Sequence, residues 1–510
     1  MNALVTVFRR TIVLATVLFT LPITVADAQT SDTSGCNVPP MPPFSSLTSD
    51  TCLPDPFTFM DGTRMTTTGQ WKCRRAEIAA EAQEFIYGYK PVTPYSATTG
   101  SMNADTLVVT VTDSGRTISF NCPIAYPSSG TAPYPAMIGL LGSFLDNSGL
   151  DSLGVAVITF PSDLIAVETN ASSRGQGLFY NIYGSNASAG VLMAWAWGVD
   201  RLIDAIEKTP AANIDPARLG VTGCSRWGKG ALAVGAFDER IKLTIPQESG
   251  SGGDASWRVS DYELAHGQQV QTLSEIVNEN CWFRQSFSQF SGSTNKLPID
   301  QNSIIDLVAP RAILMIENNI LWLGPESAWN CANASEMLFE ALGLVENIGF
   351  WETTVHNHCA FPSYQESAVT AYVRKFLLGD KTQYTYFMQS DPGYTFDRAK
   401  WVNWKMPALT VTAVHESHQQ SLPKGFFLGQ NYPNPFNPST TISFGVPKNS
   451  YVSLKVYNSL GQEVAELAAG EYSAGRYSAT FNASKLASGV YFCTMKAGEF
   501  SMTQKMILQK

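Results

Sequence analysis

The feature that most constrains this chain is a serine in a tight turn between an apolar strand and the start of a helix. The strand pattern covers 218–222, and the turn that follows reads Gly-Cys-Ser-Arg-Trp-Gly-Lys-Gly at 223–230. Glycines flank such an elbow because it needs backbone conformations that side chains disfavour. A serine at the tip projects its hydroxyl above a sheet, where a nucleophile stands. The usual pattern has glycine two residues after the serine, but Trp227 stands there, so a turn without chemistry stays open as an alternative.

The segments around Ser225 alternate between apolar strands and helical patterns. We expect helices at 76–87, 190–206 and 336–344, and strands at 107–111, 117–120, 136–141, 154–160, 219–222, 241–245, 312–316 and 350–355. Strand–helix–strand order predicts a parallel sheet covered by helices. The last 85 residues carry only strand and turn patterns. We therefore predict an α/β-hydrolase fold, a three-layer αβα sandwich, followed by a small all-β sandwich.

The N-terminus has the pattern of a secretory signal peptide. Arg9 and Arg10 precede an apolar run at 12–25 and an Ala-Asp-Ala cleavage pattern at 26–28. The run is too short to span a bilayer, and we expect no transmembrane segment elsewhere. The predicted divisions are a signal peptide at 1–28, a catalytic domain at 29–400, a linker at 401–425 and the β-sandwich at 426–510. The mature chain then meets an oxidising compartment, where cysteines can pair.

Composition narrows the classes of partner. The chain has 34 Lys and Arg against 43 Asp and Glu, a net charge of −9. This balance argues against nucleic acid or an anionic membrane surface as a partner.

A serine nucleophile needs a histidine base and an acid that orients it. Of the five histidines, His266 lies on a polar stretch and two lie in the predicted linker, whereas His356 and His358 follow the last predicted strand. Glu248 and Glu317 each follow a predicted strand, and the residues alone leave the choice of acid open. His356, His358 and Cys359 suggest a metal site as an alternative, but no fourth ligand stands at a useful spacing, so we expect no metal.

Two cysteines flank the candidate residues. Cys224 precedes Ser225, and Cys359 follows His358. If the serine and histidine meet, these cysteines come within the Cα separation of about 5.5 Å that a disulfide spans. We expect a bridge that joins the nucleophile turn to the base loop.

Several motifs together resemble the glucuronoyl esterases, carbohydrate esterase family 15, over about residues 36–400. The main ones are Gly-Cys-Ser-Arg-Trp-Gly-Lys-Gly at 223–230, Ile-Pro-Gln-Glu-Ser-Gly at 245–250 and His-Cys-Ala-Phe-Pro at 358–362. Asp-Pro-Phe at 55–57, Cys-Arg-Arg-Ala-Glu-Ile at 73–78, Trp-Ala-Trp-Gly at 195–198 and Trp-Leu-Gly-Pro at 322–325 also match. The resemblance is closer to the fungal members than to most bacterial ones.

The resemblance implies a secreted serine esterase that acts through an acyl-enzyme, without a cofactor. Its substrate would be the ester between 4-O-methyl-glucuronic acid on xylan and an alcohol of lignin, and we expect a monomer. The implied catalytic residues are Ser225 as nucleophile, His358 as base, Glu248 as acid and Arg226 as oxyanion donor. The implied sugar contacts are Lys229, Gln271, Glu279 and Trp322.

The resemblance also bears on the remaining cysteines. Cys36 and Cys73 match a family bridge. Fungal members pair a cysteine near Cys331 with one at a position that Ser256 occupies here, which leaves Cys281 as a candidate partner for Cys331. Cys52 and Cys122 are left over as a second candidate pair, and Cys493 lies in the tail.

The last segment resembles the C-terminal sorting domain of the type IX secretion system. The matching motifs are Asn-Tyr-Pro-Asn-Pro-Phe-Asn-Pro at 431–438, Val-Tyr-Asn at 456–458 with Leu-Gly at 460–461, and Ser-Gly-Val-Tyr at 488–491. They imply a Gram-negative source, export across the outer membrane by that machinery, and an extracellular or cell-surface location. A carbohydrate-binding sandwich is the alternative.

Two other functions remain in competition. An acetyl- or feruloyl-xylan esterase would use the same fold and triad, although Lys229, Gln271 and Glu279 suit a polar sugar acid better than an aromatic acyl group. A polysaccharide-binding protein that lost catalysis would not need an intact Ser225, Glu248 and His358.

Overall fold

The computed structural model describes residues 35–410, 426–429, 431, 434–472, 475–498 and 500–510. The predicted signal peptide lies outside these residues, as does the part of the predicted linker at 411–425 that holds His415 and His418.

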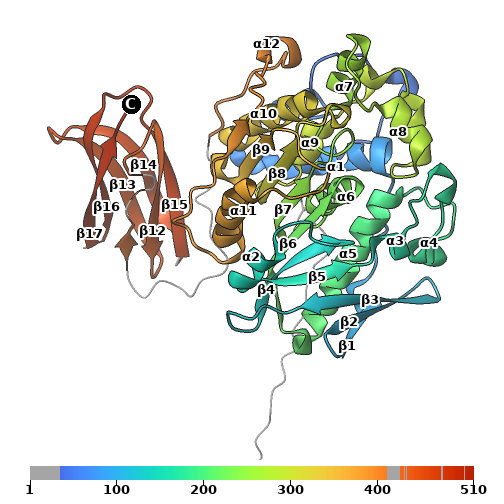
Figure 1. Ribbon diagram of the computed structural model, residues 1–510. Coiled ribbons are helices and arrows are strands. Elements are labelled where there is room, and N and C mark those ends of the chain that lie inside the picture. Colours follow the sequence, from blue (N-terminus) through green and yellow to red (C-terminus); the bar gives the residue numbers. More distant parts are fainter. Residues whose placement is uncertain (1–34, 411–425, 430, 432–433, 473–474, 499) are drawn as a thin grey trace, which may run out of the picture.

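A ten-stranded sheet forms the centre of the N-terminal unit (Figure 1). The strand order is β1-β2-β3-β5-β4-β6-β7-β8-β9-β10; β1, β2 and β3 pair antiparallel, β3 meets β5 antiparallel, and all later neighbours pair parallel. The strands are β1 Thr98–Asn103, β2 Thr106–Asp113, β3 Arg116–Ala125, β4 Tyr134–Leu140, β5 Ala156–Phe160, β6 Ile214–Cys224, β7 Ile241–Gln247, β8 Ala312–Asn318, β9 Ile348–Thr353 and β10 Met388–Ser390.

Helices cover both faces of this sheet. Alternate side chains of a strand point to opposite faces. Accordingly Ile313 of β8 joins the larger core with α5 and α10, and Leu314 joins a second core with α11. The helices are α1 Trp71–Ala82, α2 Asn147–Ser152, α3 Ser162–Ile165, α4 Leu178–Tyr183, α5 Val191–Lys208, α6 Arg226–Phe237, α7 Trp257–Ala265, α8 Leu273–Glu279, α9 Gln301–Asp306, α10 Pro325–Ala341, α11 Glu366–Tyr372 and α12 Arg398–Trp401. The three-layer αβα fold expected from the sequence is confirmed.

Two helices differ from their predicted bounds. The helix expected at 336–344 is α10, which begins at Pro325, because Gly324 takes a left-handed conformation (φ 76°) and a proline fits the first helical turn. The helix expected at 76–87 begins at Trp71 and continues beyond Ala82 as a π-helical turn, Gln83–Tyr87.

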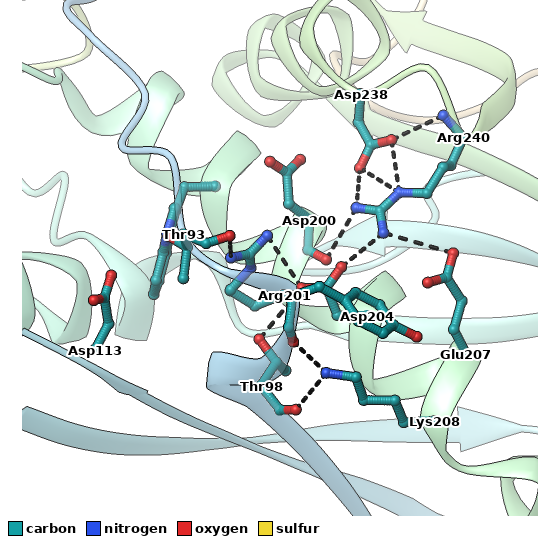
Figure 2. Close-up of polar contacts among 12 residues, drawn as sticks. Thr93, Thr98, Asp113, Asp200, Arg201, Asp204, Glu207, Lys208, Asp238 and Arg240 are labelled. Atoms are coloured by element: carbon teal, nitrogen blue, oxygen red, sulfur yellow. Dashed lines mark hydrogen bonds and ion pairs between the residues drawn. The ribbon is translucent and has the colours of Figure 1, made fainter. Parts of the chain in front are cut away.

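The edge of the sheet where the parallel strands begin carries a buried network of ion pairs (Figure 2). Arg240, just before β7, pairs with Asp204 of α5 and with Asp238, each at 2.7 Å. Arg201 pairs with the other oxygen of Asp204 at 3.1 Å, and Lys90 pairs with Asp200 at 2.6 Å. Each buried charge here has an opposite charge beside it.

The C-terminal strands form two antiparallel sheets around a core of their own (Figure 1). The sheets have the orders β11-β12-β15 and β14-β13-β16-β17. The strands are β11 Phe427–Leu428, β12 Ser439–Val446, β13 Ser450–Asn458, β14 Glu463–Tyr472, β15 Gly475–Asn482, β16 Gly489–Ala497 and β17 Phe500–Leu508. This confirms the all-β C-terminal fold. Within the described residues, no helix is long and apolar enough to cross a membrane.

The structure corrects the expectations for the remaining cysteines. The candidate pairs Cys281–Cys331 and Cys52–Cys122 are not bonded, and all four thiols are free. Cys281 faces the carbonyl oxygens of Val167 and Asn170 at 3.6 and 3.5 Å. Cys122 lies on β3 in the core, whereas Cys52 faces the carbonyl of Lys400, so the members of each pair belong to different surroundings.

Candidate active site

Ser225 stands at the tip of a strained elbow between β6 and α6. Its φ is 59° and its ψ −124°, a conformation that side chains rarely adopt. The Ser225 N–H donates to the carbonyl of Gln247 at the end of β7 (2.9 Å). A Cβ on Gly223 would lie 2.5 Å from the Trp227 carbonyl, and one on Gly228 would lie 2.6 Å from the Gln247 carbonyl. Gly228, the glycine that comes one residue later than in the usual motif, is therefore required by its close packing against β7.

His358 and Glu248 form a close pair beside this elbow. His358 Nδ1 lies 2.6 Å from Glu248 Oε2, and the same oxygen accepts the Cys359 N–H at 2.9 Å. Glu248 follows β7 with a positive φ of 45°, and its own N–H donates to the Ile316 carbonyl of β8 (2.7 Å). These backbone contacts fix a buried carboxylate against the histidine ring.

A disulfide brings the serine and histidine segments together. Cys224 and Cys359 are bonded, and their Cα atoms lie 5.7 Å apart. His358 Nε2 is buried and finds no hydrogen-bond partner among the described residues, so the bond to Ser225 is not formed in this state. Catalytic hydrogen bonds are often long without substrate. The expected bridge Cys36–Cys73 is also present, with its Cα atoms 5.1 Å apart.

The second candidate acid, Glu317, lies in β8 and contacts Ser249 and not His358. Its Oε1 accepts the Ser249 N–H at 2.9 Å, and its side chain is fully buried. Burial and the nearby Asp254 carboxyl raise the pKa of Glu317 well above its usual range. The geometry therefore pairs Glu248, and not Glu317, with the histidine.

His356, the other histidine of the loop, is held by Asn318. The Asn318 side-chain amide donates to the His356 carbonyl (3.0 Å), and His356 Nδ1 lies 3.8 Å from Glu248 Oε1. Cys224, Glu248, His358 and Cys359 bring potential ligand atoms together, but both sulfurs are consumed by the disulfide. The metal alternative of the sequence needs the Cys359 thiolate, so the disulfide contradicts it. His266 lies at the end of α7, stacked on Tyr262.

Arg226 begins α6 directly after the serine, and Glu168 holds its guanidinium. Arg226 Nη1 lies 3.3 Å from Glu168 Oε2, which also accepts from Trp282 Nε1 (3.0 Å) and from the Asn280 side chain (3.2 Å). Burial raises the pKa of Glu168, while Trp282 and Arg226 oppose the rise. This places a fixed cation one residue from the serine hydroxyl.

Three of the expected sugar contacts, Gln271, Glu279 and Trp322, are connected to one another, and Trp322 lies beside His358. The Gln271 N–H donates to the Trp322 carbonyl (2.9 Å), and the Gln271 side chain donates to Glu279 (2.6 Å). Trp322 is 44 % exposed, and the centroid of its ring lies 5.2 Å from that of the His358 ring. Lys229 is instead buried, with its Nζ donating to the carbonyls of Ser249 and Ser251, and burial lowers its pKa to about 8.

Sequence reasoning missed three residues of this site: Glu168, Asn318 and Trp282. Glu168 stands in a loop without a motif, and only the fold brings it to Arg226. Asn318 ends β8 directly after Glu317, so its place at a strand end is the one signal that the sequence offers.

This arrangement can support acyl transfer. A hydroxyl on a strained elbow, an imidazole oriented by a carboxylate, and a cation beside the hydroxyl are the parts that covalent ester cleavage requires. The polar groups and the exposed indole suit a carbohydrate.

Comparisons with known proteins agree with this chemistry. A family model described as "Glucuronyl esterase, fungi" matches residues 109–343, and one described as "Secretion system C-terminal sorting domain" matches 430–509. A 4-O-methyl-glucuronoyl methylesterase of Hypocrea jecorina is 46 % identical over 376 residues, which is 74 % of this chain and 80 % of that protein.

Solved structures give the same result. The glucuronoyl esterase catalytic domain of Hypocrea jecorina matches with a TM-score of 0.69 at 46 % identity, over 72 % of this chain and 99 % of that one. A glucuronoyl esterase of Sporotrichum thermophile, in complex with methyl 4-O-methyl-β-D-glucopyranuronate, matches with a TM-score of 0.70 at 41 % identity. That match covers 74 % of this chain and all of the other.

Proposed function

The chain belongs to the glucuronoyl esterase family, and from this premise we propose that Ser225, His358 and Glu248 are its catalytic triad. It is a carboxylic ester hydrolase that acts on glucuronoyl esters. The observation that carries the assignment of the triad is the 2.6 Å contact between His358 and Glu248, on a loop that the Cys224–Cys359 bridge ties to the serine elbow.

In the proposed mechanism, Ser225 Oγ attacks the ester carbonyl while His358 Nε2 takes its proton. Glu248 holds the ring through Nδ1 and stabilises the imidazolium that forms. His358 then gives the proton to the leaving alcohol, and water releases the glucuronate from the acyl-enzyme by the reverse proton route.

The developing oxyanion would lie beside Arg226. We assign its backbone N–H and its guanidinium as donors, with Glu168 keeping the guanidinium in place. A preorganised cation at this point costs no reorganisation when charge develops.

For the substrate, we propose a glucuronic acid side chain of xylan esterified to an alcohol of lignin. Lys229, Gln271 and Glu279 would hold the sugar hydroxyls, and Trp322 would pack on the ring. The protein would work as a monomer.

The C-terminal sorting domain indicates secretion by a Gram-negative route. We propose that the type IX machinery exports the chain and that the catalytic unit acts outside the cell or at its surface, where plant cell-wall polymers are found.

The test is hydrolysis of benzyl glucuronate, p-nitrophenyl acetate and methyl ferulate by the full chain and by Ser225→Ala. We expect turnover of the glucuronate ester that the variant loses. Turnover of only the acetate or the ferulate would replace the substrate class and keep the triad. A folded chain that hydrolyses none of the three would contradict the proposal and favour a binding protein.

A further inference from the structure

Two buried carboxyl groups lie close to Glu248, and the mechanism above does not use them. Asp254 belongs to that loop and Glu317 to β8, and neither side chain has measurable exposure. We propose that Asp254 and Glu317 share one proton and act together as a positioning pair for the catalytic acid. The inference rests on the proposed role of Glu248.

Ser249, the residue after the acid, connects the two carboxyl groups. Its N–H donates to Glu317 Oε1 at 2.9 Å, and its hydroxyl donates to Asp254 Oδ1 at 2.7 Å. The Asp254 N–H closes the turn by donating to Ser249 Oγ (3.0 Å). One oxygen of each carboxyl group is therefore satisfied by the same serine.

The other oxygen of each group has no donor. Asp254 Oδ2 and Glu317 Oε2 are both buried without a hydrogen-bond partner among the described residues. The two side chains interact directly with one another. Two buried carboxylates cannot satisfy one another, whereas a single proton between them gives each group a partner. Burial and the Asp254 carboxyl both raise the pKa of Glu317, which makes Glu317 the holder of the proton.

The local charge count supports one proton, and not none or two. Lys229 from α6 is buried beside the pair and donates to the carbonyls of Ser249 and Ser251. Within the trio of Lys229, Asp254 and Glu317, one ammonium, one carboxylate and one neutral carboxyl group sum to zero, which lowers the cost of burying them together. The other titratable groups that face the pair are Glu248 on the same loop, Glu352 on β9, Cys331 on α10 and, through Lys229, Glu279 on α8.

The pair acts on catalysis through the loop backbone. Glu248 holds a strained φ of 45°, and the hydrogen bond from Ser249 N–H anchors the next peptide. The loop is tightly packed there, since a Cβ on Gly253 would lie 2.3 Å from Ser249 Oγ. Loss of the pair would free the Glu248 carboxylate from His358, which affects kcat more than KM.

The first test measures how folding stability depends on pH in the full chain, comparing the wild type with Glu317→Gln. All eleven tryptophans lie at or before residue 404, so their fluorescence reports the catalytic unit alone. A glutamate in the unfolded chain loses its proton above about pH 4.3, whereas Glu317 keeps it in the fold, so unfolding releases one proton. The wild-type folding constant should therefore fall about tenfold more per pH unit than that of Glu317→Gln between pH 5.5 and 7.5.

Glu340→Gln is the matched control, because Glu340 is exposed on α10. It should keep the wild-type slope. Equal slopes for the wild type and Glu317→Gln would overturn the shared proton. This measurement needs no ester turnover, so it stands even if the proposed activity fails.

The second test is a double-mutant cycle on the glucuronate ester. Glu317→Gln or Asp254→Asn alone supplies an amide N–H in place of the shared proton, so each single variant should lower kcat/KM by about threefold. The double variant removes the carboxylate of the pair that faces the Lys229 ammonium. Its kcat/KM should therefore be at least about tenfold lower than the product of the single effects predicts. Glu317→Ala should lower kcat with little change in KM. A double variant equal to the product of the single effects would contradict the pair.

Discussion

The two edges of the parallel sheet differ in how their buried polar side chains are paired. At the edge where the strands begin, Arg201, Asp204 and Arg240 are matched charge against charge (Figure 2), although Asp200 Oδ1 and Arg201 Nε have no hydrogen-bond partner among the described residues. At the edge where the strands end, His358 Nε2 finds no partner among the described residues.

Backbone strain follows the same division. Among the described residues, eight that are not glycine have a positive φ, and five of them follow parallel strands at the catalytic edge: Leu141, Phe144, Ser225, Glu248 and Cys359. Strain persists only where the surroundings hold it, and it concentrates at functional sites. One edge therefore serves stability and the other serves chemistry, and substitutions should separate the two.

The largest effect is expected from Glu248→Gln at the catalytic edge. The amide keeps the shape but no longer stabilises the imidazolium, so kcat/KM for the glucuronate ester should fall by about 10⁴-fold. The midpoint of chemical unfolding should stay close to that of the wild type. A variant that is equally destabilised and inactive would erase the contrast between the edges.

Asp204→Ala at the opposite edge should produce the reverse pattern. It leaves the buried Arg201 guanidinium without its carboxylate partner, which costs about 3–5 kcal/mol of unfolding free energy, whereas Arg240 keeps its ion pair with Asp238. Activity measured at low temperature, where the variant is folded, should be retained. Unfolding followed by tryptophan fluorescence and turnover at the same temperature test both parts.

Replacing both Cys224 and Cys359 with serine should cost stability and activity together. The bridge closes a separation of 135 residues, and disulfides of this kind contribute about 2–4 kcal/mol. The control is the same change at Cys36 and Cys73, separated by 37 residues, which should cost stability alone. Full activity without the first bridge would show that the elbow and the base loop align unaided.

Glu168→Gln should have a smaller effect, on kcat above all. The amide no longer neutralises Arg226, so the guanidinium loses its fixed position beside the oxyanion, and we expect about a tenfold loss. Glu168→Asp shortens the side chain but keeps the charge, and should recover part of the rate. Kinetics on benzyl glucuronate distinguish the two variants. A Glu168→Gln rate equal to that of the wild type would mean that Arg226 acts without Glu168.

An effect of similar size, confined to high pH, is a rise in KM above about pH 8. Burial lowers the pKa of Lys229 from 10.5 to about 8. Its side chain is therefore mostly protonated below that pH and loses its charge as the pH rises through it. A sugar contact through Lys229 would weaken accordingly, by about tenfold in KM between pH 7 and 9. p-Nitrophenyl acetate has no sugar to bind, so a matching rise in its KM would point to another group.

The positions of the residues that belong to a motif could be predicted from the sequence, but the directions of their side chains could not. The elbow, the order of serine, acid and histidine, and the proximity of Cys224 to Cys359 follow from strand ends that meet at one edge. The choice between Glu248 and Glu317 does not follow from residues alone, because both acids follow or end neighbouring strands. It depends on a positive φ at Glu248 that turns one carboxylate towards His358.

The contacts that cross the fold escaped prediction for a related reason. Glu168 and Arg226 are 58 residues apart, and no periodic pattern connects them. Cys281 was the candidate partner for Cys331 because Ser256 occupies the position of the family's usual partner, yet the two cysteines have different neighbours in space. Lys229 fitted a sugar contact by type, but only the structure reveals that most of its donors already serve the loop behind Glu248.

The bridge between Cys224 and Cys359 also sets an order of events in the life of the chain. Its two halves are made 135 residues apart, and they can be joined only after the chain has left the reducing cytoplasm. Until then no disulfide joins the elbow to the base loop. The Cys224–Cys359 bridge of the finished hydrolase is thereby a product of export.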